Sequence, residues 1–316
     1  MSFRKILATI LPALISLGFL YVVFDKIDLP PFDQILNHLH PVTVVLTSFI
    51  FALQFIANSF RLLYILKAFQ ITLPWQKLVS INTHAALAAS FFFGGVGEVM
   101  AKYGQLMFRK VQSLENVSIV IMDKYIATLS SLTCATISLY FIQSHYPGAL
   151  SPGIIALFVL TLVGAILTSG LLMIYHPKMD RLFKSPKLKR ILKIALKVHE
   201  HPALFLKSLS ISLFGYGLYF IGSATLLQGL DLQEHLPQLF LFVPFVTFLT
   251  SLPISFNGWG IREYAWLIIF GLVGLDRGMG ATYSIALGIM NYGAIAVLYT
   301  FLLGLKIFQT FKKSPS

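Results

Sequence analysis

The stretch LFLFVPFVTFLTSLPISFNGWGIRE, residues 239–263, joins a long apolar run to an abrupt polar break. After the break the apolar character continues only to about Gly274, which is short for a helix that crosses a bilayer, because a crossing takes about 20 residues. A second apolar run, beginning at Leu78, is interrupted in the same way at Phe93-Gly94-Gly95-Val96-Gly97-Glu98. Each break holds a Gly-x-Gly sequence followed closely by a glutamate. The sequence therefore predicts two short helical hairpins, each broken at glycines.

The composition of the whole chain excludes a water-soluble protein. Of its 316 residues, 57% are hydrophobic and 11% are charged, and the mean hydropathy is +0.80, whereas a soluble domain carries about 25% charged residues. We therefore expect an all-α polytopic membrane protein that forms a single integral membrane domain over residues 1–316. The lone Cys134 lies inside an apolar run, so the sequence offers no disulfide and no Cys-rich metal site.

Six further apolar segments are long enough to span a membrane as full helices. They lie at about 6–24, 42–66, 117–142, 153–175, 203–228 and 281–305. The first resembles a signal peptide in length, but Pro12 interrupts it and Asp25-Lys26-Ile27-Asp28 follows in place of a cleavage site. We therefore expect an uncleaved first span.

The charges of the loops predict the orientation of these spans, because Lys and Arg collect in the cytoplasmic loops of membrane proteins. The loop 176–201 has eight Lys or Arg residues, whereas the loop 229–236 has two acidic residues and no basic one. The pattern predicts a multi-pass membrane protein with both termini cytoplasmic. Its two hairpins are re-entrant and enter from opposite faces. Within 176–201, basic and apolar residues alternate with helical spacing, which favours an amphipathic helix on an anionic lipid surface.

This topology contains an internal repeat of opposite orientation. A span, a hairpin and a span over residues 42–142 are matched by a span, a hairpin and a span over 203–305. Short, glycine-interrupted segments in two inverted halves indicate a transporter-like site near the membrane midplane. The alternative is a pair of ordinary helical hairpins joined by Gly-rich turns.

Charged side chains within apolar segments are costly in a membrane, so each is a candidate functional residue. The charged candidates are Arg61, Glu98, Lys102, Asp123, Lys124, Arg262 and Glu263. Around the breaks, the candidates for substrate binding are Gly95, Gly97, Asn257, Gly258 and Gly260, because glycines permit turns and the helices that follow present free N–H groups to an anion.

For some of these residues the sequence leaves a structural alternative open. Arg61 and Lys102 fit equally well as side chains that reach to the membrane surface. Glu98 and Lys102 are four residues apart, so a local ion pair is an alternative. Arg262 and Glu263 are adjacent and are not expected to face each other on a helix, so we expect each of them to have another partner or a ligand.

The sequence contains no metal-ligating His spacing, no phosphate-binding loop and no nucleophile elbow. We therefore expect no catalytic residue, no metal and no cofactor. The basic net charge of +12 fits anionic lipid headgroups, so we expect membrane lipids and no nucleic acid as partners, and a homodimer is left open.

With these residues in view, the sequence resembles the lysylphosphatidylglycerol synthase transmembrane, or flippase-like, family. The resemblance is most specific at Phe93-Gly94-Gly95-Val96-Gly97-Glu98, at Asp123-Lys124-Tyr125 and at residues 252–263, and Arg61 also fits. It implies lipid translocation in a bacterial or archaeal cytoplasmic membrane, with re-entrant helices around a central cavity. We expect the stand-alone form, without the soluble aminoacyl-transfer domain, and therefore no synthesis of lysyl-lipid.

The resulting hypothesis is a flippase that moves a lipid with a phosphate-containing headgroup, either a phospholipid or a polyprenyl phosphate. Arg61, Lys124 and Arg262 would hold the phosphate, and Glu98, Asp123 and Glu263 would balance these cations or pair with a cationic headgroup. Proton coupling and passive scrambling both remain open. The alternatives are a secondary transporter of a small polar solute, a membrane-embedded lipid-modifying enzyme, and a non-catalytic partner of a lipid or polysaccharide synthesis complex.

Overall fold

The computed structural model describes residues 39–89, 95–109, 111, 113–174, 197–252 and 258–313. Within these ranges the chain is helical and contains no strand. The elements are α3 (Pro41–Ala68), α4 (Trp75–Ala89), α5 (Val96–Met107), α6 (Ser113–His145), α7 (Pro152–Ile174), α9 (Pro202–Gly229), the 3₁₀ turn η3 (Gln233–His235), α10 (Leu236–Ser251), α11 (Ile261–Val273) and α12 (Arg277–Lys313).

Five of the described helices are long and apolar enough to cross a membrane, namely α3, α6, α7, α9 and α12. They coincide with five of the six predicted spans, and the sixth, at residues 6–24, lies outside the described residues. Large apolar side chains remain exposed along them, for example Leu160, Leu167 and Leu171 on α7. Such a surface suits lipid rather than water, and the prediction of an all-α polytopic membrane protein is confirmed.

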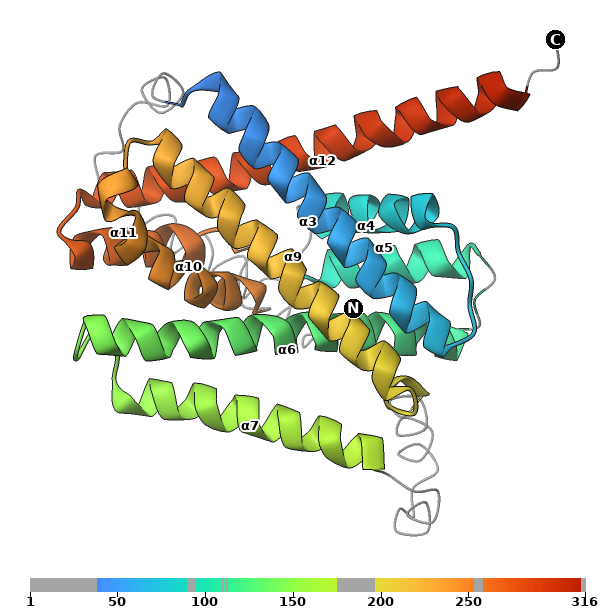
Figure 1. Ribbon diagram of the computed structural model, residues 1–316, viewed down its shortest axis with the longest axis horizontal. Helices are drawn as coiled ribbons and strands as arrows, with labels where there is room; N and C mark the ends of the chain where they lie inside the picture. Colours follow the sequence, from blue (N-terminus) through green and yellow to red (C-terminus); the bar gives the residue numbers. More distant parts are fainter. Residues whose placement is uncertain are drawn as a thin grey trace, which may run out of the picture.

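Four shorter helices occupy the positions of the two predicted hairpins. Helix α4 packs on α5, and α10 packs on α11. Each second helix starts at a glycine with positive φ, at Gly95 (75°) and Gly260 (84°), a conformation that favours residues without a Cβ atom. In Figure 1 the pair α4–α5 lies towards one end of the molecule and the pair α10–α11 towards the other. The re-entrant path of each pair through a bilayer stays a prediction.

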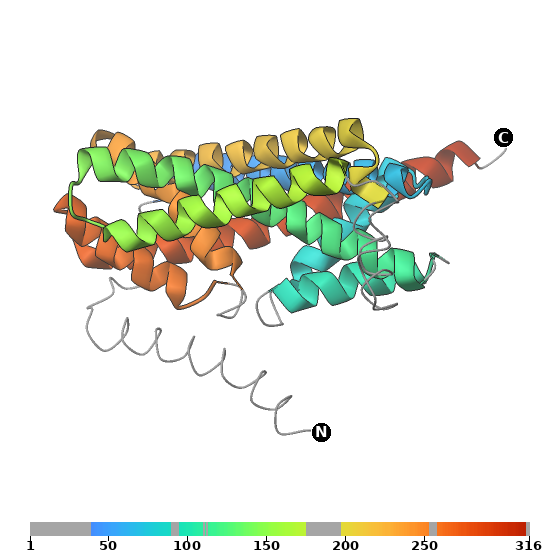
Figure 2. The same ribbon diagram turned by 90° about the horizontal axis from the view of Figure 1, so that it is seen from below.

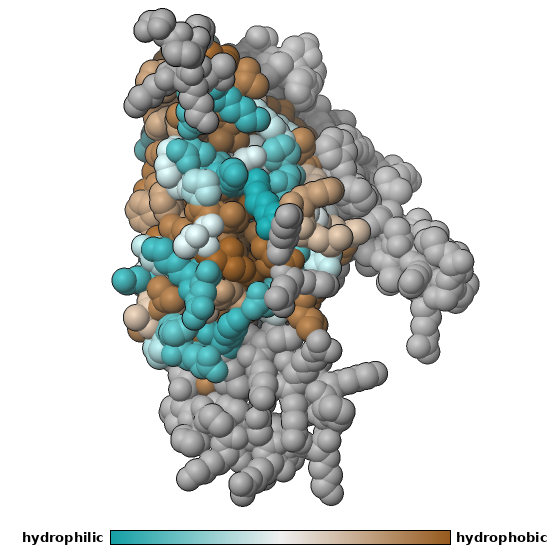
Figure 3. All heavy atoms as spheres, turned by 90° about the vertical axis from the view of Figure 1, so that its right-hand side faces the viewer, coloured by the Kyte–Doolittle hydropathy of each residue, from teal (hydrophilic) through white to brown (hydrophobic). Residues whose placement is uncertain are grey.

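The described helix ends next to segments that the charge pattern places on the cytoplasmic side lie at one end of the molecule. Helices α3 and α12 end there, and α6 and α9 begin there (Figure 1). Figure 3 looks onto this end and shows hydrophilic side chains gathered among hydrophobic ones. The sidedness itself stays a prediction, and most of the amphipathic helix expected within 176–201 lies outside the described residues.

Helices α3 and α9 form the central contact of the fold and run side by side along their length (Figure 1). Two glycines of α9 make this approach possible. A Cβ atom at Gly222 would lie 2.5 Å from the ring of Phe51, and one at Gly229 would lie 2.2 Å from Thr43. Small residues at such positions let helix backbones approach closely in membranes, where packing rather than the hydrophobic effect holds helices together.

The helix packing is matched between the two units of the predicted repeat. If α3, α4, α5 and α6 are exchanged with α9, α10, α11 and α12, each packed pair maps onto another packed pair. For example, α6 packs on α10 just as α12 packs on α4, and α5 packs on α6 just as α11 packs on α12. Among the described helices, α7 has no counterpart in this exchange, and it lies on the outside of α6 (Figure 2).

Candidate functional site

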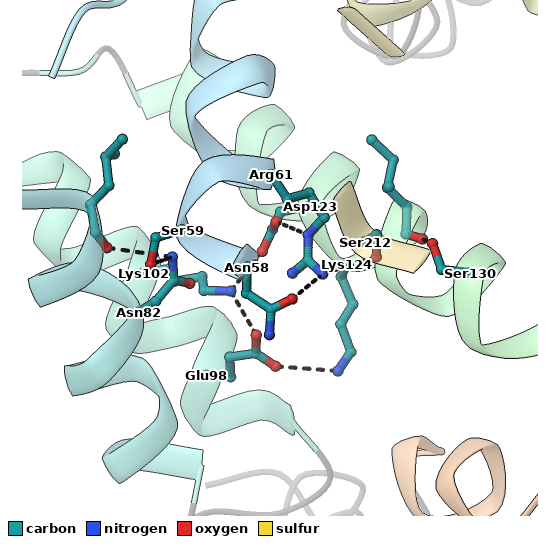
Figure 4. A network of polar contacts seen from close by, with 12 residues as sticks. Asn58, Ser59, Arg61, Asn82, Glu98, Lys102, Asp123, Lys124, Ser130 and Ser212 are labelled. Carbon is teal, nitrogen blue, oxygen red and sulfur yellow. Dashed lines mark hydrogen bonds and ion pairs between the residues drawn. The ribbon is translucent and has the colours of Figure 1, made fainter. Parts of the chain in front are cut away.

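Five of the predicted charged residues form one continuous network between α3, α5 and α6 (Figure 4). Arg61 Nε donates to Asp123 Oδ1 at 2.7 Å, and Lys102 Nζ donates to the other oxygen of the same carboxylate at 2.6 Å. Lys102 Nζ also contacts Glu98 Oε1 at 2.6 Å, and Lys124 Nζ reaches Glu98 Oε2 at 3.3 Å. The network therefore alternates cation and anion across three helices.

The inner end of this network is saturated and shielded. Arg61 Nη1 donates to Asn58 Oδ1 at 3.0 Å and to Ser212 Oγ at 3.2 Å on α9. The side chains of Arg61 and Lys102 are 4% and 3% exposed. Both therefore lie between helices and not at the membrane surface, so the alternative in which they extend to the interface is wrong. The local Glu98–Lys102 ion pair is present, but Lys102 also binds Asp123.

The outer end of the network is more accessible. The side chain of Lys124 is 34% exposed and that of Glu98 is 26% exposed. A Cβ atom at Gly95 would lie 2.9 Å from Lys124 Nζ, so the amine sits directly against the first turn of α5. Gly97, the other predicted glycine of this break, is buried in that turn. Lys124 is therefore the most exposed cation of this network.

The second group of charges lies at the start of α11. Glu263 Oε2 accepts a hydrogen bond from the N–H of its own N-cap, Gly260, at 2.6 Å. Its Oε1 accepts from Ser284 Oγ on α12 at 2.9 Å and lies 3.1 Å from Arg262 Nη2. Arg262 Nε also donates to the Ser284 hydroxyl, at 2.9 Å.

One expectation about this group is wrong. Arg262 and Glu263 do contact each other, because the Glu263 side chain folds back to cap the helix and Arg262 bends along the same end. Two N–H groups at the start of α11 already have partners, since that of Gly260 binds Glu263 and that of Arg262 binds the carbonyl of Gly258 at 2.9 Å. The expected anion site at this helix start stays a prediction.

The neighbouring glycines and aromatic side chain position Arg262. Gly258 has a φ of 81°, and a Cβ atom there would lie 2.9 Å from Thr250. The guanidinium carbon of Arg262 lies 5.0 Å from the centre of the Trp259 ring, within the range of a cation–π interaction. A Cβ atom at Gly288 of α12 would lie 2.8 Å from Arg262 Nη2 and 3.3 Å from that ring. Asn257, the remaining predicted site residue, lies outside the described residues.

A cavity of about 270 Å³ brings the two charged groups together. Its charged and aromatic wall residues include Arg61, Glu98, Lys102 and Lys124 from one unit and Trp259 and Arg262 from the other. Ligand pockets usually measure about 300–1,000 Å³, so this cavity is slightly smaller than a usual ligand pocket and too small for a whole lipid.

Several wall residues were not predicted from the sequence as substrate-binding residues. They are Gln54, Asn82, Tyr216, Tyr219, Trp259 and Gly288. Polar residues inside apolar segments, such as Gln54 and Asn82, are visible in a sequence, but nothing local separates those that line a cavity from those that bond between helices. In the described part of the chain, no three His, Cys, Asp or Glu side chains are grouped closely enough to hold a metal ion.

The fold and the site define a multi-pass α-helical membrane protein with a charged cavity between two helix units. A family model described as "Lysylphosphatidylglycerol synthase TM region" matches residues 9–298. The chain therefore belongs to this family, as the motifs had indicated, and the family places it among membrane proteins involved in lipid handling. No curated protein and no solved structure matches the chain significantly.

Proposed function

We propose that this protein is a lipid flippase, which moves a lipid with a phosphate-containing headgroup between the two leaflets of its membrane. The observation that carries the proposal is the cavity of about 270 Å³ lined by Lys124 and Arg262 from opposite units. Its size suits a headgroup, and the exposed helix surfaces suit acyl chains that stay in the bilayer. The family's link to lipid handling supports the same class of substrate.

The contacts divide the charged residues into two roles. Lys124 and Arg262 are the ligand-facing cations, because Lys124 is partly exposed and Arg262 lies against the cavity wall. Arg61 and Lys102 also line the cavity, but Asp123 holds both of them and their side chains are almost fully buried, so we assign them a positioning role. Glu98 connects the two roles, since one of its oxygens binds Lys102 and the other faces Lys124.

Alternating exposure of the cavity would follow from movement of one unit against the other. The matched packing of α3–α6 and α9–α12 supports this part of the proposal, because inverted units around a midplane site rock about that site in many transporters. In this proposal the protein breaks no covalent bond, and membrane lipids with anionic headgroups are its partners, with a homodimer still open.

Reconstitution of the full chain into liposomes tests the function directly. Fluorescent phospholipids and polyprenyl phosphates in the inner leaflet should become accessible to an external quencher faster than in protein-free liposomes. Arg262→Ala and Lys124→Ala should slow this transfer, whereas Lys77→Ala, at an exposed position of α4 away from the cavity, should not. Solute uptake without any lipid transfer would replace the proposal with a secondary transporter.

The proposed orientation has its own test. We place the protein in the cytoplasmic membrane with both termini inside. After Cys134→Ser, single cysteines introduced at Asp231 and Lys187 should react with membrane-impermeant reagents from opposite sides. Labelling of both positions from the outer side would contradict the inverted topology.

A further inference from the structure

The cavity wall contains one acidic group among its described residues, Glu98, and that group is already neutralised. Its two oxygens lie 2.6 Å from Lys102 Nζ and 3.3 Å from Lys124 Nζ. Asp123 and Glu263 are not wall residues, and each is paired with cations that are: Asp123 with Arg61 and Lys102, and Glu263 with Arg262. A cationic headgroup would therefore find no free counter-charge here and would lie close to Lys124 and Arg262.

The charges around the cavity match a single negative charge. Three cations, Arg61, Lys102 and Lys124, face two carboxylates, Glu98 and Asp123, in the first network, and Arg262 and Glu263 balance each other. The surplus is one positive charge. A phosphodiester carries one negative charge, whereas a phosphate monoester carries about 1.5 to 2 at neutral pH.

The rest of the wall is rich in neutral hydrogen-bonding groups. Amides are contributed by Gln54, Asn58, Asn82 and Asn291, and hydroxyls by Tyr216 and Tyr219. Gln54 lies one turn before Asn58 on α3, and its Oε1 is buried without a hydrogen-bond partner. A buried acceptor of this kind carries the full cost of its lost hydration until a donor reaches it.

Aromatic rings complete the wall beside these polar groups. Trp259, whose ring is stacked with Arg262, lies on the same cavity as Tyr216 and Tyr219. Hydroxyl groups both donate and accept, so they fit a wall of amides and phenols, and the C–H faces of a sugar or polyol ring fit aromatic rings. An ammonium group can only donate and brings a charge that the wall does not compensate.

We infer that the cavity selects a phosphodiester headgroup rich in hydroxyl groups over an aminoacyl or other cationic headgroup. The selected headgroup would be a glycosyl or polyol phosphodiester, and this inference rests on the proposed lipid transfer. Lys124 and Arg262 bind the phosphodiester, and Gln54 Oε1 accepts a hydrogen bond from a headgroup hydroxyl. Gln54 is the specificity-determining residue of this assignment.

The test compares four lipids with identical labelled acyl chains in the same proteoliposomes. Phosphatidylinositol and phosphatidylglycerol share their charge and differ in hydroxyl number, phosphatidylethanolamine carries an ammonium group, and lysyl-phosphatidylglycerol is cationic. We expect phosphatidylinositol to move about tenfold faster than lysyl-phosphatidylglycerol, because like charges in a binding site select strongly against a wrong partner. Equal or faster transfer of lysyl-phosphatidylglycerol would overturn the inference. Equal rates for phosphatidylinositol and phosphatidylglycerol would reject the part of it that assigns selection to headgroup hydroxyls.

The Gln54→Leu variant isolates the specificity residue. It should lower the preference for phosphatidylinositol over phosphatidylglycerol by about three- to tenfold, the value of one hydrogen bond. Gln228→Leu, at an exposed position on α9, is the matched control. An unchanged preference in Gln54→Leu would reject the role of Gln54.

A binding measurement separates this inference from the proposed function. Glycerophosphoinositol should raise the thermal unfolding temperature of the purified protein, and glycerophosphoethanolamine should not, because only a ligand bound to the folded state stabilises it. If no lipid moves but this difference is found, the flippase proposal fails and the headgroup assignment stands. Equal stabilisation by both compounds would overturn the assignment even if lipids move.

Discussion

The starts of α5 and α11 have the same local sequence pattern but use it differently. In each, a glycine N-cap is followed three residues later by a glutamate, Gly95 with Glu98 and Gly260 with Glu263. Glu263 turns back to its own N-cap and is 1% exposed, whereas Glu98 turns away to two lysines and is 26% exposed. The second unit thus has a closed, local cap, and the first has a network that bridges helices and reaches the cavity. The same glycine–glutamate spacing can therefore place one carboxylate in a local helix cap and the other in a network that reaches a cavity.

The largest loss of stability is expected at Asp123, the most deeply buried carboxylate of the network between α3, α5 and α6. Asp123→Ala would leave Arg61 and Lys102 without their shared carboxylate, and removal of one partner from a buried ion pair costs about 3–5 kcal/mol. Thermal unfolding in detergent should show this loss. Glu115→Ala is the control, because it breaks the partly exposed pair with Lys197, which is worth about 1 kcal/mol or less. Equal losses in both variants would contradict the network as a source of stability.

Arg262→Ala should affect transfer more than folding. Glu263 would keep its hydrogen bonds to Gly260 and Ser284, so we expect a stability loss of only about 1–3 kcal/mol. Transfer per folded protein should fall about tenfold or more, because a charge-assisted bond to phosphate is lost. Arg262→Lys should recover only part of it, since an ammonium group lacks the planar fork of arginine. Full transfer by Arg262→Ala would remove this residue from the site.

The comparison between the two glutamates can be tested by the same conservative change in each. Glu263→Gln weakens a helix cap, so we expect a stability loss of about 1 kcal/mol and little change in the substrate preference. Glu98→Gln should instead release Lys124 and alter transfer rate and lipid preference. The measurements are unfolding temperature and transfer, made on both variants. If Glu98→Gln lowers only stability, the two carboxylates have the same role.

The smallest effect on transfer and stability is expected from a change in the packing around Arg262. Gly288→Ala places a methyl group where Arg262 Nη2 and the Trp259 ring now lie. A flexible arginine can shift, so we expect transfer to fall by about three- to tenfold with a stability change of about 1 kcal/mol. Gly170→Ala on α7, where an added Cβ atom meets nothing within 4 Å, should leave transfer at the wild-type rate. Equal transfer in the two variants would show that the position of Arg262 is not critical.

The sequence predicted the membrane spans well because the hydrophobic thickness of a bilayer sets the length of an apolar helix, independently of its neighbours. Five predicted spans are described as helices at the expected positions. The glycine breaks were also visible, since Gly95 and Gly260 adopt positive φ at helix starts. For the site, the cost of a charge among apolar residues was enough to identify Arg61, Asp123 and Arg262 as unusual.

The partners of these charges could not be obtained from the sequence. Arg61 and Asp123 are 62 residues apart and meet only because α3 and α6 pack around Lys102. The adjacent Arg262 and Glu263 were expected to point apart, which holds within a regular helix but not at its first turn, where a side chain folds back to cap the free N–H groups. Trp259 and Gly288 were missed because their role depends on how closely α12 approaches α11.

The sequence by itself determined the class of the protein, its membrane spans and its family, since these depend on local hydropathy, on charge and on short motifs. Only the tertiary structure decided which charges are held by internal partners and which stay more exposed. Arg61 and Lys124 are both basic residues within apolar runs and both line the cavity, yet Arg61 is held by Asp123, Asn58 and Ser212 and its side chain is 4% exposed, whereas that of Lys124 is 34% exposed. The physical reason is that a charge inside a membrane protein takes its function from the groups that surround it in space, and those groups come from distant parts of the chain.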